Sequence, residues 1–145
     1  MNILEYQFPE LLHKRLSNKY GWDDNFIKGV LDEYRKFLFL GSQYKVTPSE
    51  IIDEVWHSHL LFSKDYRNVE KILGKEFNHE PGDNVSFKSQ YNNTIDLYRQ
   101  HFGEPPAIYW RKMPFKEDLQ HFISVNKKLK FTIAILLIAY IYLIF

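Results

Sequence analysis

The hydrophobic residues along the first two thirds of the chain recur at intervals of three and four positions, which is typical of amphipathic α-helices. The clearest stripe predicts a helix that begins at Asp23 or Asp24 and ends at Gly41. The apolar positions of this helix are Phe26, Ile27, Val30, Leu31, Tyr34 and Leu38.

Start and stop signals predict the neighbouring helices. One helix runs from Pro9, a residue suited to a first helical position, to Gly21. The run Thr47-Pro48-Ser49-Glu50 forms a capping box with proline at the first helical position. The helix behind this capping box is expected to reach Gly74, with a kink near Ser63.

Residues 77–84 are predicted to form a loop, and a last helix of the body is expected to end at Gly103, before Pro105 and Pro106. No stretch alternates between apolar and polar residues as a strand would. The sequence therefore predicts an all-α fold, a compact helical bundle followed by a C-terminal transmembrane helix. The apolar stripe of the last body helix is Phe87, Tyr91, Ile95, Tyr98 and Phe102.

The transmembrane helix is predicted over the uncharged run from Phe131 to Phe145. This run would form about 22 Å of helix, and the lysines just before it can extend the usable span by snorkelling. A competing interpretation continues an amphipathic helix from Leu119 along the membrane surface or onto the body. We expect three segments: a helical domain over residues 1–115, a basic juxtamembrane segment over 116–130, and a tail anchor over 131–145 that contacts the lipid bilayer.

Charge supports this division. Residues 111–130 carry six Lys and Arg against two Asp and Glu, whereas residues 1–110 carry 13 against 16. Positive residues stay on the cytoplasmic side of a membrane, so a single-pass protein with a cytoplasmic N-terminal domain is expected. The overall balance of 19 Lys and Arg to 18 Asp and Glu argues against a nucleic-acid partner.

Composition excludes several classes of site. The chain has no Cys, which rules out disulfides, thiolate metal sites and cysteine nucleophiles. Neither a glycine-rich phosphate loop nor a G-x-S-x-G elbow occurs, which argues against nucleotide-dependent enzymes and serine hydrolases. The abundant aromatic residues, 17% of the chain, are interpreted as core. The isolated histidines His13, His101 and His121 are interpreted as surface or boundary residues.

The densest group of polar and aromatic residues lies between residues 52 and 81. Asp53 and His57 are four residues apart and therefore share one helix face, and His79 in the following loop could return to them. Two imidazoles and one carboxylate would suit zinc, iron or manganese. His59 points about 200° away from His57 and is not expected to share this ion. The alternative is a buried hydrogen-bonded network in which Asp53 holds His57, with Trp56 and His59 on the core side.

The run Asp53-x-x-Trp56-His57-x-His59 and the residues that follow it resemble the signature of the glycine-rich domain-containing protein family. The family core has no assigned reaction, and this chain lacks the glycine-rich tail that gives the family its name. The resemblance singles out Asp53, Trp56, His57, His59 and His79. The matching residues are Asp53, Trp56, His57, His59, Leu61, Tyr66, Leu73, Gly74, His79 and Pro81, then Tyr91, Thr94, Tyr98, Phe102 to Pro106, Tyr109 and Trp110.

Two functions are compatible with this sequence. The first is a membrane-anchored helical binding or scaffold module with a protein partner, which we favour because a fold resemblance does not deliver a reaction. The second is a metal-dependent, hydrolase-like enzyme that uses Asp53, His57 and His79, with Glu54 or Glu80 as general base. In either case, Trp110 is expected to pack on the helical body near Trp56.

Overall fold

The computed structural model describes residues 2–78 and 87–110. Within these residues every regular element is a helix, so the predicted all-α fold is confirmed. The chain divides into two units, Met1–Lys112 and Met113–Phe145, and the described residues all belong to the first. The elements are the 3₁₀ turn η1 (Ile3–Glu5) and the helices α1 (Glu10–Tyr20), α2 (Asp24–Gln43), α3 (Glu50–Leu60), α4 (Ser63–Leu73), α5 (Phe87–Phe102) and α6 (Ala107–Trp110).

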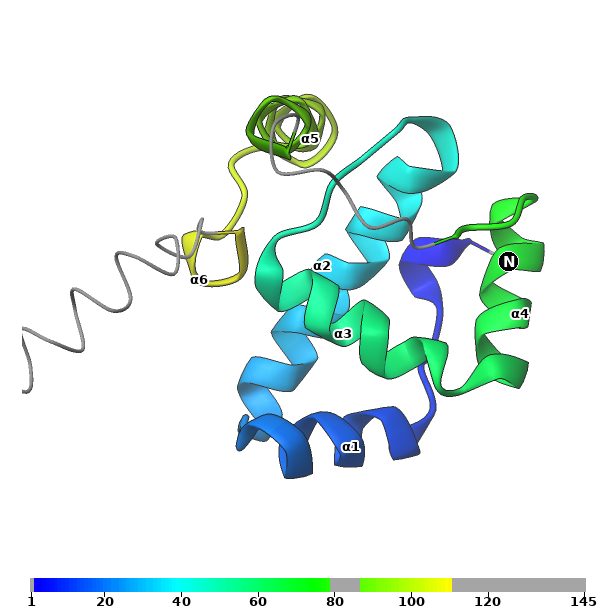
Figure 1. Ribbon diagram of the computed structural model, residues 1–145. Coiled ribbons are helices and arrows are strands. Elements are labelled where there is room, and N and C mark those ends of the chain that lie inside the picture. The colour runs from blue at the N-terminus through cyan, green and yellow to red at the C-terminus, as the bar shows by residue number, and fades with distance from the viewer. Residues whose placement is uncertain (1, 79–86, 111–145) are drawn as a thin grey trace, which may run out of the picture. The chain divides into compact units, whose positions relative to one another are not determined.

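The long helix α2 is the centre of the first unit (Figure 1). It packs against η1, α1, α3, α4 and α5, while α3 crosses it and contacts α1, α4 and α6. Burial of apolar surface along α2 provides the main driving force for this arrangement. Its fully buried residues include Tyr34, Phe37, Leu38 and Leu40.

The start of α2 agrees with the sequence, but its end does not. Asp23 is the N-cap, and its side chain accepts a hydrogen bond of 2.9 Å from the Phe26 N–H. The helix does not stop at Gly41, because the Tyr44 N–H still bonds to the Leu40 carbonyl at 2.9 Å. Gly41 is buried, and the ring of Phe77 occupies the space that a side chain would need. This glycine therefore provides room for packing and does not end the helix.

The predicted capping box is also wrong by two residues. Ser49 is the N-cap of α3, and its hydroxyl accepts a hydrogen bond of 3.2 Å from the Ile52 N–H. Thr47 is buried beside α5 instead, where its N–H donates to the Thr94 hydroxyl at 2.8 Å. Tertiary contact with α5 thus takes Thr47 away from the helix end. The Ser49 hydroxyl also donates to the Tyr109 carbonyl at 2.6 Å, which joins α3 to α6.

The single helix expected up to Gly74 is two helices, α3 and α4. Phe62, at φ −95° and ψ 59°, breaks the helical path just before Ser63, where a kink was expected. The helices α1, α4 and α5 end as predicted, at Gly21, Gly74 and Gly103, which all have a positive φ.

In the part of the chain that the structure describes, no helix is long and apolar enough to span a membrane. The predicted membrane segment, Phe131–Phe145, and the basic segment before it lie outside the described residues.

Candidate functional site

Helix α3 presents the predicted motif residues on two faces. Trp56 and His59 point into the core, where they are 5% and 0% exposed. Asp53 and His57 lie on the outer side of the helix, with side-chain exposures of 31% and 46%. The expectation that His59 faces away from His57 therefore agrees with the geometry. The alternative also agrees in placing Trp56 and His59 on the core side, but His57 itself is not buried.

Asp53 and His57 form a close pair on this outer face. His57 Nδ1 lies 2.9 Å from the Asp53 carbonyl oxygen and 3.3 Å from Asp53 Oδ2. A carbonyl only accepts, so Nδ1 carries the proton, and in the neutral ring Nε2 carries the lone pair that a metal ion takes. His79, the third predicted ligand, lies outside the described residues. Among residues 2–78 and 87–110, no group of three or more His, Asp or Glu side chains could hold a metal ion.

Glu54, the proposed general base on α3, is engaged with α1. Tyr20 donates a short hydrogen bond to Glu54 Oε2, and Lys19 Nζ lies 3.3 Å from the same oxygen. Burial acts to raise the pKa of Glu54, but the contacts with Tyr20 and Lys19 outweigh it, so the pKa is lowered. A carboxylate stabilised in this way is a weaker base, and its contacts join α1 to α3.

His59 is the centre of a buried hydrogen-bonded network. His59 Nε2 lies 2.8 Å from Asp65 Oδ2, and His59 Nδ1 lies 3.1 Å from the Tyr34 hydroxyl. The carboxylate accepts, so Nε2 is protonated, and the Tyr34 hydroxyl donates to Nδ1. Tyr6 completes the network by donating to Asp65 Oδ1 at 2.8 Å. The network joins the N-terminal segment, α2, α3 and α4.

Burial lowers the pKa of His59, although the hydrogen bond to Asp65 opposes this effect. The same burial raises the pKa of Tyr34 well above its ordinary value. Both rings are fully buried, and they pack edge-to-face with their centroids 5.7 Å apart. His59 is therefore a neutral, internally bonded structural residue that no ligand in solvent reaches.

Trp56 and Tyr66, the aromatic positions of the motif, are also used internally. Trp56 Nε1 donates to the Tyr66 hydroxyl at 2.8 Å, and this hydroxyl donates a short hydrogen bond to the Phe77 carbonyl. The rings of Trp56 and Phe77 stack with centroids 4.7 Å apart. Burial raises the pKa of Tyr66 to about 12, so the phenol stays protonated. These contacts hold the segment after α4 against α3.

Trp110 packs on the helical body, as expected, but its partners are Glu33 and Tyr98 and not the predicted Trp56. Its side chain is 4% exposed, its Nε1 donates to Glu33 Oε2 at 2.7 Å, and its ring lies 5.1 Å from the Tyr98 ring. Sequence reasoning missed Glu33, which lies on the apolar face of α2 between Val30 and Phe37. A charged residue inside an apolar stripe is the signal that identifies it.

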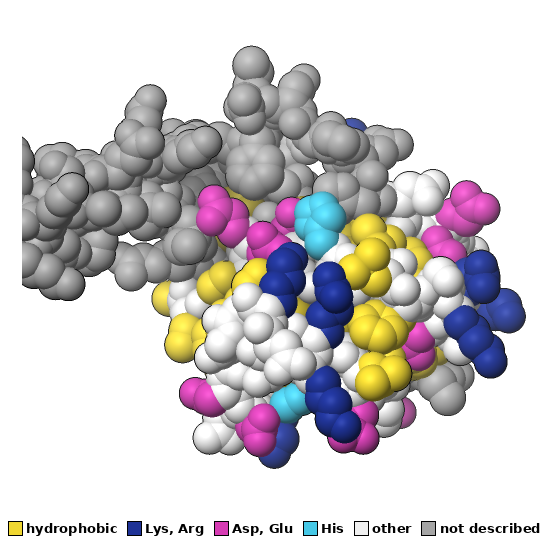
Figure 2. All heavy atoms as spheres, turned by 60° about the horizontal axis from the view of Figure 1, so that its bottom comes forward, with side chains coloured by type: hydrophobic (Ala, Val, Ile, Leu, Met, Phe, Trp, Pro, Cys, Tyr) yellow, Lys and Arg dark blue, Asp and Glu magenta, His cyan; other side chains and the backbone are white. Residues whose placement is uncertain are grey.

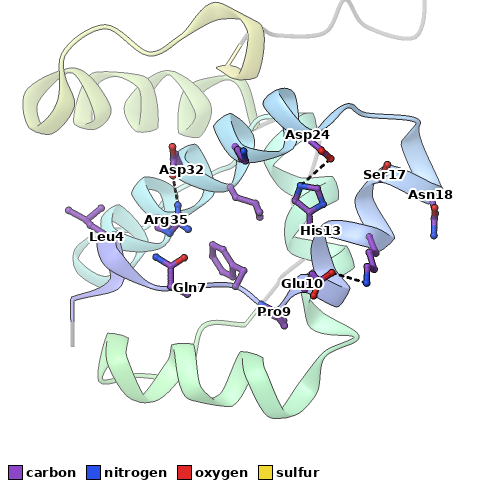
Figure 3. A pocket seen from close by; sticks show the side chains of 14 residues that line it. Leu4, Gln7, Pro9, Glu10, His13, Ser17, Asn18, Asp24, Asp32 and Arg35 are labelled. Carbon is purple, nitrogen blue, oxygen red and sulfur yellow. Dashed lines mark hydrogen bonds and ion pairs between the residues drawn. The ribbon is translucent and has the colours of Figure 1, made fainter.

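Outside these networks, the structure has an open cleft of about 940 Å³ between the N-terminal segment, α1 and α2 (Figure 3). Its wall from the N-terminal segment includes Leu4, Gln7, Phe8 and Pro9. His13 also lines it, with Nε2 3.7 Å from Asp24 Oδ1 on α2, and its partial exposure agrees with the interpretation of this histidine as a surface or boundary residue. The other lining residues are Glu10, Lys14, Ser17, Asn18, Asp24, Lys28, Leu31, Asp32 and Arg35.

The charged side chains of the cleft are mixed in sign. Three acidic and three basic side chains line it. Some of them pair within one helix: Arg35 pairs with Asp32 on α2, and Lys14 Nζ lies 2.8 Å from Glu10 Oε1 on α1. The face that carries α1 likewise shows acidic and basic side chains interspersed with apolar ones (Figure 2). A cleft of this composition suits a polar ligand with charges of both signs.

A family model described as UCP032817-like matches residues 1–106, so the chain belongs to the UCP032817-like family. This finding corrects the resemblance to the glycine-rich domain-containing protein family, which is a different family. In this chain Trp56, His59 and Tyr66 are used in buried hydrogen bonds. No curated protein and no solved structure matches the chain.

Proposed function

We propose that this member of the UCP032817-like family is a membrane-anchored helical binding module whose partner occupies the cleft between the N-terminal segment, α1 and α2. One observation carries the proposal. The chemically versatile motif residues Trp56, His59 and Tyr66 are used up in internal hydrogen bonds, whereas the charged cleft is open to solvent. Buried, mutually bonded polar groups specify a rigid framework, and an open cleft offers that framework a binding surface.

Membrane attachment is the second part of the proposal, and it is supported by the sequence alone. The uncharged run Phe131–Phe145 follows Lys127, Lys128 and Lys130, which would keep the helical domain on the cytoplasmic side. Carbonate extraction tests this part. Full-length protein should stay in the membrane pellet, and a chain that ends at Asn126 should be in the supernatant. Recovery of full-length protein in the supernatant would exclude a membrane anchor.

Site-specific photo-crosslinking in membranes tests the binding function. A photoreactive amino acid at Lys28, which lines the cleft, should give a discrete adduct on illumination. The matched control is the same amino acid at Lys71, an exposed position on α4 outside the cleft, which should give none. Identical adduct patterns at the two positions, or no adduct at Lys28, would contradict the proposal.

The alternative function is a metal-dependent, hydrolase-like enzyme. The observation that favours it is the exposed Asp53–His57 pair, in which the hydrogen bond to the Asp53 carbonyl leaves Nε2 of the neutral ring as the ligand atom. Elemental analysis of the purified protein separates the two functions. Stoichiometric zinc, iron or manganese that is lost in His57→Ala would support the enzyme, and metal-free protein would support the binding module.

A further inference from the structure

The segment between η1 and α1 is an extended stretch of main chain at the edge of the cleft. Tyr6 (φ −64°, ψ 132°) and Pro9 (φ −64°, ψ 143°) both have extended conformations. The Tyr6 carbonyl accepts a hydrogen bond from Arg35 Nε, and the Pro9 carbonyl accepts one from the Leu12 N–H. For the N–H and C=O groups of Gln7 and Phe8 between them, the described residues provide no hydrogen-bond partner.

This main chain forms part of the cleft wall. Gln7, Phe8, Pro9 and Glu10 are consecutive and all line the cleft. The ring of Phe8 packs against Tyr34 and His59 in the core, so its side chain is turned inward. The main chain of Gln7 and Phe8, whose N–H and C=O groups are unpaired within the described residues, runs along this wall, and extended backbone with unpaired polar groups is a template for a further extended chain.

The opposite wall is a row of charges on α2. Asp24, Lys28, Asp32 and Arg35 line the cleft and alternate in sign along one face of the helix. Eleven residues separate the first from the last, which corresponds to about 16 Å of helix. An extended chain covers this length in about five residues. Asp32 and Arg35 are paired with each other, whereas Lys28 has no ion pair within residues 2–78 and 87–110.

These two walls restrict the ligand. Equal numbers of acidic and basic side chains disfavour a polyanion such as a nucleic acid. The charged rim disfavours a purely apolar molecule, because such a ligand would desolvate the charges without pairing them. A polypeptide in extended conformation meets both requirements, since it brings main-chain donors and acceptors as well as side chains of either charge.

We infer that the cleft binds an extended peptide segment of a partner protein, about five residues long, with both acidic and basic side chains. The peptide hydrogen-bonds to the main chain of Gln7 and Phe8 and places its charged side chains along the row on α2. An acidic side chain of the peptide pairs with Lys28. This inference rests on the proposed binding function and adds the chemical class of the partner.

Selection from a displayed library of random octapeptides on the purified full-length protein tests the inference. The enriched peptides should carry charges of both signs and bind with dissociation constants on the order of 10⁻⁴ to 10⁻⁶ M, as measured by fluorescence anisotropy. Absence of enrichment, or enrichment of peptides with charges of one sign only, would overturn it.

Two modifications test the main-chain pairing. N-methylation of alternate amides in an enriched peptide should weaken binding about tenfold or more, because it removes donors and blocks close approach. Gln7→Pro, which removes one main-chain N–H next to an extended Tyr6, should weaken binding about threefold or more, whereas Gln7→Ala keeps the N–H and should not. Circular dichroism checks that each variant is folded. If Gln7→Pro does not fold, the methylated peptides alone test the main-chain pairing, and Lys28→Glu, which repels the acidic side chain of the peptide, should weaken binding about threefold or more.

The outcomes separate this inference from the proposed function. Equal binding of methylated and unmethylated peptides, together with a specific photo-crosslink at Lys28, would overturn extended-chain pairing and leave the binding module intact. Failure of both the peptide selection and the crosslink would overturn both.

Discussion

The indole Nε1 of Trp110 donates a hydrogen bond of 2.7 Å to Oε2 of Glu33, a residue 77 positions earlier in the chain. The Tyr98 hydroxyl donates to the same oxygen at 2.6 Å, and Lys36 Nζ lies 2.7 Å from Glu33 Oε1. Burial acts to lower the pKa of Lys36, but the bonds to Glu33 and Tyr98 outweigh it and raise the pKa. One buried carboxylate thus connects α2, α5 and α6.

Glu33→Ala should therefore be strongly destabilising. The substitution leaves the Tyr98 hydroxyl and the Trp110 N–H buried without an acceptor, and it leaves Lys36 without its main partner. We expect a loss of about 2–4 kcal/mol in the free energy of unfolding, measured by urea denaturation. Glu33→Gln keeps one acceptor and should lose less. A loss below about 0.5 kcal/mol in Glu33→Ala would show that the carboxylate does not hold these helices together.

Protonation of His59 should make the protein less stable in mild acid. An unfolded histidine has a pKa of about 6.5, whereas burial lowers the pKa of His59 in the folded state. Between these two values the unfolded chain binds more protons, so stability falls as the pH drops below about 6.5. Urea midpoints measured from pH 7.5 to 5 should show this fall, and His59→Gln should reduce its slope in that window.

Nitrogen NMR of the His59 ring gives an independent check on the folded protein. The neutral ring should be protonated at Nε2, since Asp65 Oδ2 accepts from this atom and the Tyr34 hydroxyl donates to Nδ1. A ring protonated at Nδ1, or one that titrates above its ordinary pKa, would contradict the network.

Gly41→Ala should destabilise the protein, although alanine is the better helix former by about 1 kcal/mol. The new methyl group would collide with the Phe77 ring, and this ring cannot move easily because it packs against Trp56 and Phe37. Overpacking of this kind costs about 1–3 kcal/mol, and we expect this cost to exceed the gain of about 1 kcal/mol in helix propensity. In the double mutant with Phe77→Ala, the second substitution should remove most of the penalty of Gly41→Ala, which a double-mutant cycle of urea denaturation measures.

Ser58→Ala should stabilise the protein or leave it unchanged. Ser58 is 1% exposed, and its hydroxyl has no hydrogen-bond partner within the described residues. Removing an unsatisfied buried hydroxyl relieves a desolvation penalty of about 1 kcal/mol or more. Thermal unfolding measures the change, and Thr94→Ala is the matched control. The buried Thr94 hydroxyl accepts from the Thr47 N–H, so its loss should destabilise.

Several helix boundaries were predictable from local chemistry. Neighbouring residues alone determine the start of α2 at Asp23 or Asp24, the glycines after α1, α4 and α5, and the apolar stripe of α2. The structure agrees with each of them. The four-residue spacing of Asp53 and His57 also sufficed to place their side chains together, because helical geometry fixes that relationship.

Contacts between distant segments were decided by the tertiary structure. Gly41 lies inside α2 with the Phe77 ring packed on it, and Thr47 lies beside α5, where its N–H bonds to Thr94 and its hydroxyl to Gln90. Glu33 accepts a hydrogen bond from Trp110, and His59 is hydrogen-bonded to Asp65 and Tyr34. The cleft is lined by residues of the N-terminal segment, α1 and α2, so it forms only when these segments come together. The energies of these contacts depend on which surfaces meet, and sequence periodicity reports only which face of a helix is buried, not what covers it.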